Sequence, residues 1–346
     1  MNHIVSPDQK MEKVQIPGSL VYVNDSMEGY YRTGEAPNFS YTDKEGIEIS
    51  DDKILERING LVIPPDWRNV WICKKPLGHI QATGRDAKGR KQYIYHQRWS
   101  IHLSRQKFDN LREFGVRLPI IRAQIKADLR KRSWNKRKIT ALAIKLMEES
   151  YVRVGNKLYQ KMNGTFGLTT LRRKHLKVSG NGLMLQFIAK SGKEMKVRIT
   201  HPTLRKQLKQ CSELPGHELF RYKEGSKYLP LNSSDINEYL REVSEINISS
   251  KDFRTWGGTV LTVKFEPVAR QICTENPRKK FDTTLVKLVA AELNNTVSVC
   301  RKYYIHPKVL DVAVKGKLAN FFPSEKKVSN SPYSREELIV LNIISE

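Results

Sequence analysis

The first hundred residues alternate short apolar runs with Asp, Asn and Gly, a pattern that predicts a small antiparallel β domain. Strands bounded by turn residues commonly pair with their neighbours along the chain, so we assign residues 1–100 to one β-rich domain. The apolar runs lie at residues 21–23, 39–41, 47–49, 70–73 and 92–95.

From about Trp99 the apolar positions change to helical spacing, as at Ile139, Leu142, Ala143 and Leu146. A very basic stretch, residues 122–138, comes before this run and contains one acidic residue, Asp128. Such a stretch is either a solvated helix face or a surface for a polyanion.

A second β segment follows, with candidate strands at residues 175–178, 183–188 and 194–199. Gly-containing turns at 179–182 and 189–193 join them as two hairpins. Helices are predicted at 281–293 and 336–345. The fold class is therefore α+β: a small N-terminal antiparallel β domain and a larger, mainly α-helical domain, residues 101–346, that carries a small β-hairpin sheet.

The charge of the chain points to a polyanionic partner. Lysine and arginine outnumber aspartate and glutamate 61 to 36 in 346 residues, for a formal net charge of +25, and nucleic acid is the leading candidate. No long apolar run favours a membrane. The polar N-terminal residues exclude a secretory signal, and four widely spaced cysteines suggest reduced thiols. We expect a cytoplasmic protein, associated with the nucleoid if bacterial.

Residues 84–91 superficially resemble a phosphate-binding P-loop, but Arg90 and Lys91 replace the lysine and Ser/Thr of that motif. ATP binding is therefore rejected. A basic turn followed by Gln92, Tyr93 and Tyr95 suits a DNA groove, with cations for phosphates, an amide for base edges and aromatic rings for packing. An ordinary exposed hairpin is the alternative.

The histidines and carboxylates argue against a metal site. Eight histidines lack the spacing of metal ligands, and the acidic residues are mostly interleaved with lysine. We expect chemistry that needs no metal and no cofactor.

Two arginines occupy apolar surroundings where an unpaired guanidinium is costly. Arg153 lies within an apolar run, and Arg254 lies between Phe253 and Trp256, followed by glycines that permit close backbone approach. Each arginine either pairs with a buried carboxylate or binds an external anion. With the adjacent tyrosines 303 and 304 in a basic segment, they make a set suited to phosphoryl transfer.

At this point the chain resembles the type IB DNA topoisomerases, in particular the compact bacterial and poxvirus-like branch. The resemblance runs through residues 63–67, 78–86 and 89–93 to His306-Pro307. The order of these motifs is more specific than any one of them.

The resemblance implies a catalytic role for five residues. Tyr304 corresponds to the nucleophile, Arg153 and Arg254 to phosphate-clamping arginines, and Lys190, at a hairpin tip, to the general acid for the departing 5′ oxygen. Asn295, nine positions before Tyr304, stands where poxvirus members have histidine and bacterial members asparagine. An amide can still donate a hydrogen bond to a nonbridging phosphate oxygen.

The resemblance also implies double-stranded DNA as the partner of a monomer clamped around the duplex. No membrane and no nucleotide cofactor take part. The reaction would be ATP-independent and metal-independent relaxation of supercoiled DNA through a 3′-phosphotyrosyl intermediate. The corresponding DNA-binding positions are Lys251, Arg90, Lys91, Gln92, Tyr93, Tyr95 and Tyr159.

Two alternatives remain at this point. A tyrosine recombinase uses a related catalytic set, but favours His-x-x-Arg where this chain has Lys251-Asp252-Phe253-Arg254. A noncatalytic basic DNA-binding protein would explain the charge but not the ordered motifs.

Overall fold

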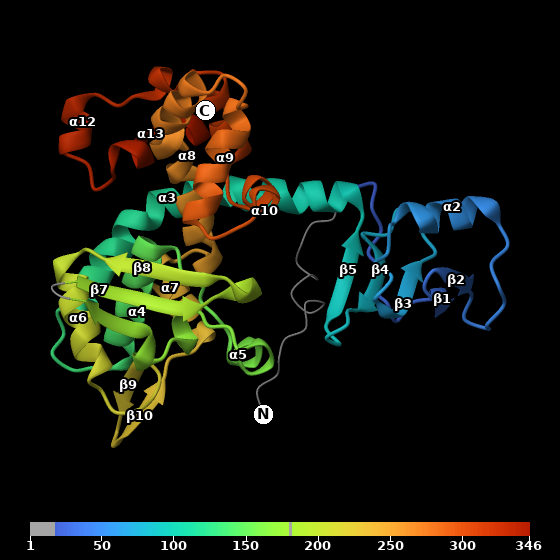
Figure 1. Ribbon diagram of the computed structural model, residues 1–346, viewed down its shortest axis with the longest axis horizontal. Helices are drawn as coiled ribbons and strands as arrows, with labels where there is room; N and C mark the ends of the chain where they lie inside the picture. Colours follow the sequence, from blue (N-terminus) through green and yellow to red (C-terminus); the bar gives the residue numbers. More distant parts are fainter. Residues whose placement is uncertain (1–17, 180–181) are drawn as a thin grey trace. The chain divides into compact units, whose positions relative to one another are not determined.

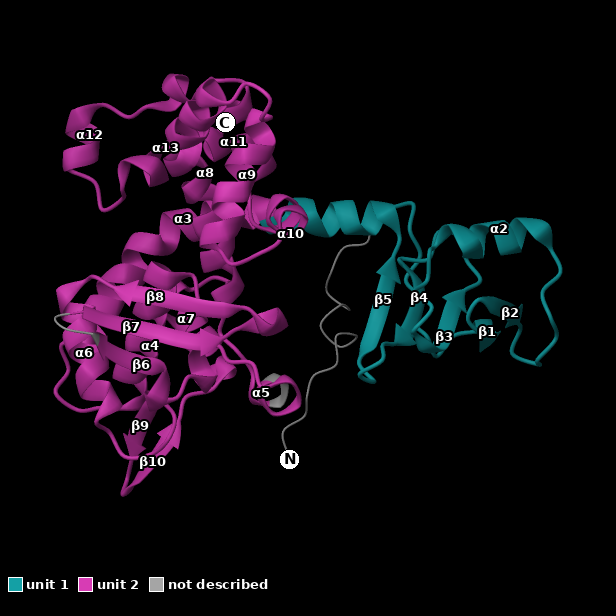
Figure 2. Ribbon diagram, viewed as in Figure 1, with its two compact units in different colours: residues 1–107 teal, residues 108–346 magenta. Residues whose placement is uncertain are grey.

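The computed structural model describes residues 18–179 and 182–346 and divides into two compact units, Met1–Lys107 and Phe108–Glu346 (Figure 2). The boundary between the units falls inside the long helix α3 (Gln97–Leu129). The boundary predicted at residue 100 lies within the same helix.

The first unit is built on one antiparallel sheet with the strand order β2-β1-β3-β4-β5 (Figure 1). Both faces of β3 are buried. Val70 and Ile72 pack with Ile58 of the helix α2 (Asp52–Gly60) on one side, whereas Trp71 and Cys73 pack with other residues on the opposite side. The elements are β1 (Gly29–Glu35), β2 (Asn38–Thr42), α2 (Asp52–Gly60), β3 (Arg68–Cys73), β4 (Ile80–Arg85) and β5 (Lys91–Tyr95).

The expected strands of this unit are only partly correct. The runs at 39–41, 70–73 and 92–95 lie in β2, β3 and β5, but 21–23 and 47–49 form only isolated bridges, through Val21 and Glu48. The pattern missed β1, β4 and α2. β4 was missed because it carries buried polar side chains, and Gln81 among them donates to the Gly78 carbonyl oxygen at 2.7 Å.

The basic stretch 122–138 does not form one solvated helix face. It ends α3, turns, and enters α4 (Lys136–Ser150), where the side chain of Asn135 accepts from the Lys138 amide at 2.9 Å. Asp128 is fully buried and accepts hydrogen bonds from Arg137 Nε at 3.1 Å and Tyr239 Oη at 2.9 Å. Part of the positive charge is therefore used to join helices.

The second unit contains the predicted three-stranded sheet, in the order β6-β7-β8 (Figure 2). Its strands are β6 (Leu176–Ser179), β7 (Gly182–Ile188) and β8 (Glu194–Ile199). The β6–β7 turn at 180–181 lies outside the described residues. A further hairpin, β9 (Arg221–Glu224) and β10 (Lys227–Pro230), was not predicted.

Helices make up most of the second unit and enclose its main core. Phe114 from α3, Leu142 from α4, Leu185 from β7 and Ile339 from the last helix all belong to this core. The α+β class and the predicted helices at 281–293 and 336–345 are confirmed. The further helices are α5 (Lys157–Asn163), α6 (Pro202–Ser212), α7 (Ser233–Ser244), α8 (Ser250–Glu275), α9 (Phe281–Glu292), α10 (Val297–Tyr303), α11 (Pro307–Val314), α12 (Glu325–Ser329) and α13 (Arg335–Ser345).

Within residues 18–179 and 182–346, no helix combines the length and apolar content needed to span a bilayer.

Candidate active site

Arg153 enters the site from the loop that leaves α4. The helix ends at Tyr151, which takes up a left-handed conformation (φ 54°) and turns the chain sharply. The carbonyl of Arg153 accepts from the Leu168 amide at 2.8 Å, and a Cβ on Gly167 would lie 2.6 Å from this oxygen. These contacts fix the main chain at Arg153 and do not involve its half-buried side chain.

Arg254 lies in the first turns of α8 and is 4% exposed. Its guanidinium donates to two main-chain carbonyls, through Nη1 to Tyr151 and through Nη2 to Leu293 at 2.7 Å. These carbonyls come from the ends of α4 and α9, so Arg254 joins three helices.

Asn295 and Tyr304 complete the cluster from either side of α10. The Asn295 amide oxygen accepts from Arg153 Nη2, and Tyr304 follows the last residue of α10. The Tyr304 ring lies 5.1 Å from the Arg254 guanidinium carbon, and its hydroxyl takes part in side-chain hydrogen bonding with both arginines. The predicted nucleophile, clamp arginines and Asn295 therefore meet at one place.

No carboxylate neutralises the two arginines in the described part of the chain. Both guanidiniums donate instead to main-chain carbonyls or to the Asn295 side chain, so the described residues give no support to the alternative of two buried salt bridges. Burial lowers the pKa of Arg153, and burial followed by the charge of Arg153 lowers the pKa of Arg254 to about 10. Both groups remain cationic at neutral pH, and an external anion would relieve their desolvation and mutual repulsion.

Two buried donors in the cluster lack a hydrogen-bond partner among the described residues: Arg254 Nε and Asn295 Nδ2. Because Arg153 donates to the oxygen of the Asn295 amide, the NH2 group must face the other way. Buried donors without partners are costly. An anion with several acceptor oxygens, such as a phosphodiester, would satisfy them.

Lys190 and Lys251 lie outside this contact network. Lys190 is exposed at the tip of the β7–β8 hairpin, in a short 3₁₀ turn with Ser191 at φ 67°, and no hydrogen bond or ion pair holds it within the described residues. Lys251 is exposed in the first turn of α8, three residues before Arg254. Their predicted roles remain predictions.

The predicted DNA-binding residues of the first unit lie on the β4–β5 hairpin. Asp86 accepts from Arg90 Nε at 2.7 Å and from Gln92 Nε2 at 2.9 Å, and the Arg90 hydrogen bond lowers the Asp86 pKa to about 2. Lys91 Nζ lies 2.7 Å from an Asp25 oxygen. Sequence reasoning missed both aspartates, although the spacing Asp86–Arg90 is typical of a turn with an internal ion pair.

The aromatic members of that set are Tyr93 and Tyr95, whose rings stack at 5.7 Å between centroids. The side chain of Tyr159, on α5, lies outside the described residues. Sequence reasoning also missed the carbonyls of Tyr151 and Leu293, because a main-chain acceptor leaves no signature in the side-chain pattern.

Chemically, two desolvated guanidiniums and an amide donor beside a phenol suit a tyrosine that attacks a phosphate. Comparison with known proteins agrees with this class. Residues 97–323 match the model for the eukaryotic DNA topoisomerase I catalytic core, and residues 38–86 match that for the bacterial DNA topoisomerase IB N-terminal domain. The chain belongs to the type IB DNA topoisomerase family, whose members are isomerases.

Named viral relatives cover most of the chain. DNA topoisomerase 1B of Acanthamoeba polyphaga mimivirus is 32% identical over 302 residues, which are 83% of this chain and 88% of the relative. DNA topoisomerase I of monkeypox virus is 24% identical over 294 residues, with coverage of 82% and 88%. DNA topoisomerase 1B of vaccinia virus (strain Copenhagen) gives the same values.

Proposed function

We propose that this protein relaxes supercoiled double-stranded DNA by cutting and resealing one strand through Tyr304. The observation that carries the proposal is the meeting of Tyr304 with half-buried Arg153 and buried Arg254, neither of which has a carboxylate partner among the described residues. A single phosphodiester bound by the two guanidiniums would supply the missing anion.

In the proposed reaction the Tyr304 oxygen loses its proton to solvent water as it attacks the phosphorus, and the bond from phosphorus to the 5′ oxygen breaks. A 3′-phosphotyrosyl ester forms and a 5′-hydroxyl strand leaves. Arg153, Arg254 and the NH2 group of Asn295 stabilise the charge that grows on the nonbridging oxygens. One such donor is typically worth about 10²–10³ in rate.

Lys190 is the proposed general acid that protonates the leaving 5′ oxygen, a contribution of about 10²–10⁴ in rate. Its exposed position on a hairpin tip allows it to enter a DNA groove. Lys251, one turn before Arg254, is proposed to contact a neighbouring phosphate. The β4–β5 hairpin, with Arg90, Lys91, Gln92, Tyr93 and Tyr95, and Tyr159 of the second unit are proposed to bind the duplex.

The energy of the broken phosphodiester is kept in the phosphotyrosyl ester, so resealing is the reverse reaction. No nucleotide, metal or other cofactor is needed for it. While the strand is open, its free end rotates and supercoils are lost. We propose that a monomer carries out this cycle in the compartment that holds the DNA.

The test is relaxation of both positively and negatively supercoiled plasmid in EDTA without ATP, together with denaturant trapping of the covalent adduct. Relaxation with a trapped 3′ adduct is expected. DNA binding without any adduct would overturn the proposal and favour a noncatalytic DNA-binding protein. Exchange of strands between two specific duplexes would favour a recombinase.

A further inference from the structure

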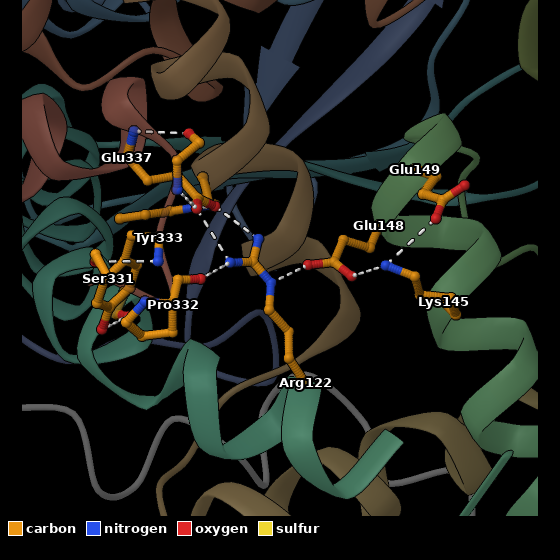
Figure 3. Close-up of polar contacts among 11 residues, drawn as sticks. Arg122, Lys145, Glu148, Glu149, Ser331, Pro332, Tyr333 and Glu337 are labelled. Atoms are coloured by element: carbon orange, nitrogen blue, oxygen red, sulfur yellow. Dashed lines mark hydrogen bonds and ion pairs between the residues drawn. The ribbon is translucent and has the colours of Figure 1, made fainter. Parts of the chain in front are cut away.

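Arg122, near the end of α3, contacts carboxylates from two other helices (Figure 3). Its Nε donates to Glu148 of α4 at 2.6 Å. Its two Nη atoms donate to the two oxygens of Glu337 of α13, at 2.7 and 3.0 Å. Only the planar fork of arginine can engage both carboxylates in this way.

Glu337 extends the network to α8. Its Oε1 atom also accepts from the indole nitrogen of Trp256 at 3.1 Å, and Trp256 comes two residues after Arg254. The Ser334 main-chain amide donates to Glu337 Oε2 at 2.9 Å, which fixes the carboxylate at the start of α13. The carboxylate therefore has little freedom to turn.

The Trp256 ring is enclosed on its other side by α3. A Cβ on Gly115 would lie 2.5 Å from the ring, and the Phe114 ring lies 6.0 Å from it between centroids. The indole has no space to adopt another orientation. A shift of α13 or α3 would therefore also move α8, the helix that carries Trp256.

Glu148 extends the network to the other catalytic arginine. It lies three residues before Tyr151, the left-handed residue that ends α4 and leads directly to Arg153. The carbonyl of Tyr151 is also an acceptor for Arg254. Lys145 Nζ, 3.3 Å from Glu148, further supports the carboxylate.

The network is mostly removed from water. The side chain of Glu337 is 7% exposed and that of Glu148 is 13% exposed. Burial by itself would raise the pKa of Glu337, but the hydrogen bonds and charge of Arg122 lower it below its usual value. Glu337 is therefore charged at neutral pH, and one guanidinium holds both carboxylates.

We propose that Arg122 is a positioning residue, which fixes the end of α4 and the start of α8 and so sets the spacing between Arg153 and Arg254. This inference rests on the proposed function of those two arginines. It also assigns a role to α13, since Glu337 lies beyond residues 97–323, the part matched by the catalytic-core family model.

Arg122→Gln removes the charge while keeping a polar side chain, and Arg137→Gln is the matched control. Arg137 also pairs with a buried carboxylate, Asp128, but its partners lie on α3 and α7. The Arg122 partner Glu337, in contrast, also accepts from Trp256 of α8. Both variants are expected to lower the melting temperature. Only Arg122→Gln is expected to slow single-turnover cleavage, by about 10²-fold if the guanidiniums shift by about 1 Å.

Non-covalent DNA affinity, measured in a Tyr304→Phe background, is expected to be the same in both variants. Trp256→Phe, which keeps an aromatic side chain but loses the indole N–H that donates to Glu337, serves as the milder variant if Arg122→Gln does not fold. It is expected to slow cleavage in the same direction, and an unchanged rate in it would count against the proposal.

A double-mutant cycle separates positioning from general destabilisation. If Arg122 acts through the arginines, its loss adds little once Arg254 is alanine, so Arg122→Gln/Arg254→Ala should be far less impaired than the product of the single effects. Fully multiplicative effects, or equal rates in Arg122→Gln and Arg137→Gln, would overturn the positioning role alone. Absence of adduct in the unsubstituted protein would overturn the proposed function and this inference with it.

Discussion

Gly258 of α8 lies directly against the main chain of Tyr304: a Cβ at position 258 would be 2.4 Å from the Tyr304 carbonyl oxygen. The next residue reinforces this contact, because Thr259 Oγ1 accepts from the His306 amide at 3.1 Å. The helix that carries Arg254 therefore also places the backbone of the proposed nucleophile.

Gly258→Ala is expected to displace Tyr304, since the contacted atom is backbone and cannot swing away. Overpacking of this kind costs about 1–3 kcal/mol, and a shift of about 1 Å at the reacting group costs about 10²-fold in rate. Single-turnover cleavage below the melting temperature measures the effect. Gly60→Ala is the control, because a Cβ there meets no atom within 4 Å; equal cleavage rates in both variants would contradict the prediction.

Tyr304→Phe is expected to abolish adduct formation and relaxation while non-covalent DNA binding stays nearly unchanged, because only the attacking oxygen is lost. Tyr303→Phe is the matched control. Tyr303 is 42% exposed and its ring lies beside Lys302, so this variant should remain active. The reverse pattern would show that the assignment is off by one residue and would remove the argument for Asn295.

Arg153→Ala and Arg254→Ala should each slow cleavage and resealing by about 10²–10³-fold, with a much smaller effect on DNA binding. Arg254→Lys should not restore the rate, because one ammonium group cannot reproduce the planar fork that reaches both Tyr151 and Leu293. Rapid-quench cleavage kinetics test both statements. A near-normal rate in either alanine variant would leave that arginine a structural role only.

Lys190→Ala should cleave ordinary DNA slowly and recover much of its rate when sulfur replaces the scissile 5′ oxygen, since a thiolate leaves without a proton. Arg254→Ala should show little recovery, because its defect lies at the nonbridging oxygens. Similar recovery in both variants, or none in either, would reduce Lys190 to a phosphate contact. Lys251 would then be the next candidate for the acid.

Two histidines in the second unit should make its stability depend on acid pH. Burial lowers the pKa of His175 and of His306 to about 4, and the Nδ1 atom of each accepts a main-chain N–H, from Arg172 at 3.0 Å and from Lys308 at 3.2 Å. The unfolded chain binds protons near pH 6.5 and the folded chain does not, so stability falls as pH drops from about 6.5 to 4.

Asn replaces the Nδ1 acceptor of histidine without titrating. His175→Asn/His306→Asn is therefore expected to flatten the pH dependence of the melting temperature over that window, with little change at pH 7. Thermal denaturation at several pH values measures this. A slope equal to that of the unsubstituted protein would show that other groups cause the acid sensitivity.

Local sequence patterns were enough to predict an element where the spacing of its own apolar residues shows which face is buried. The alternation in residues 183–199 predicted β7 and β8, and helical spacing predicted α9 and α13. The same reasoning failed for β1 and β4, whose polar residues and glycines acquire their environment only when the sheet forms. The order of the motifs and the apolar neighbours of Arg153 and Arg254 indicated these two residues from the sequence alone.

The sequence by itself determined the residue types of the site, the excess of positive charge and the family. Only the tertiary structure decided what the arginines contact: Arg254 donates to Leu293, 39 residues away, and Arg153 to Asn295, 142 residues away. The acceptor for Arg254 is a main-chain carbonyl, and the acceptor for Arg153 is a side-chain amide oxygen that is turned toward it. Such contacts depend on where helix ends meet in three dimensions, which no local periodicity encodes.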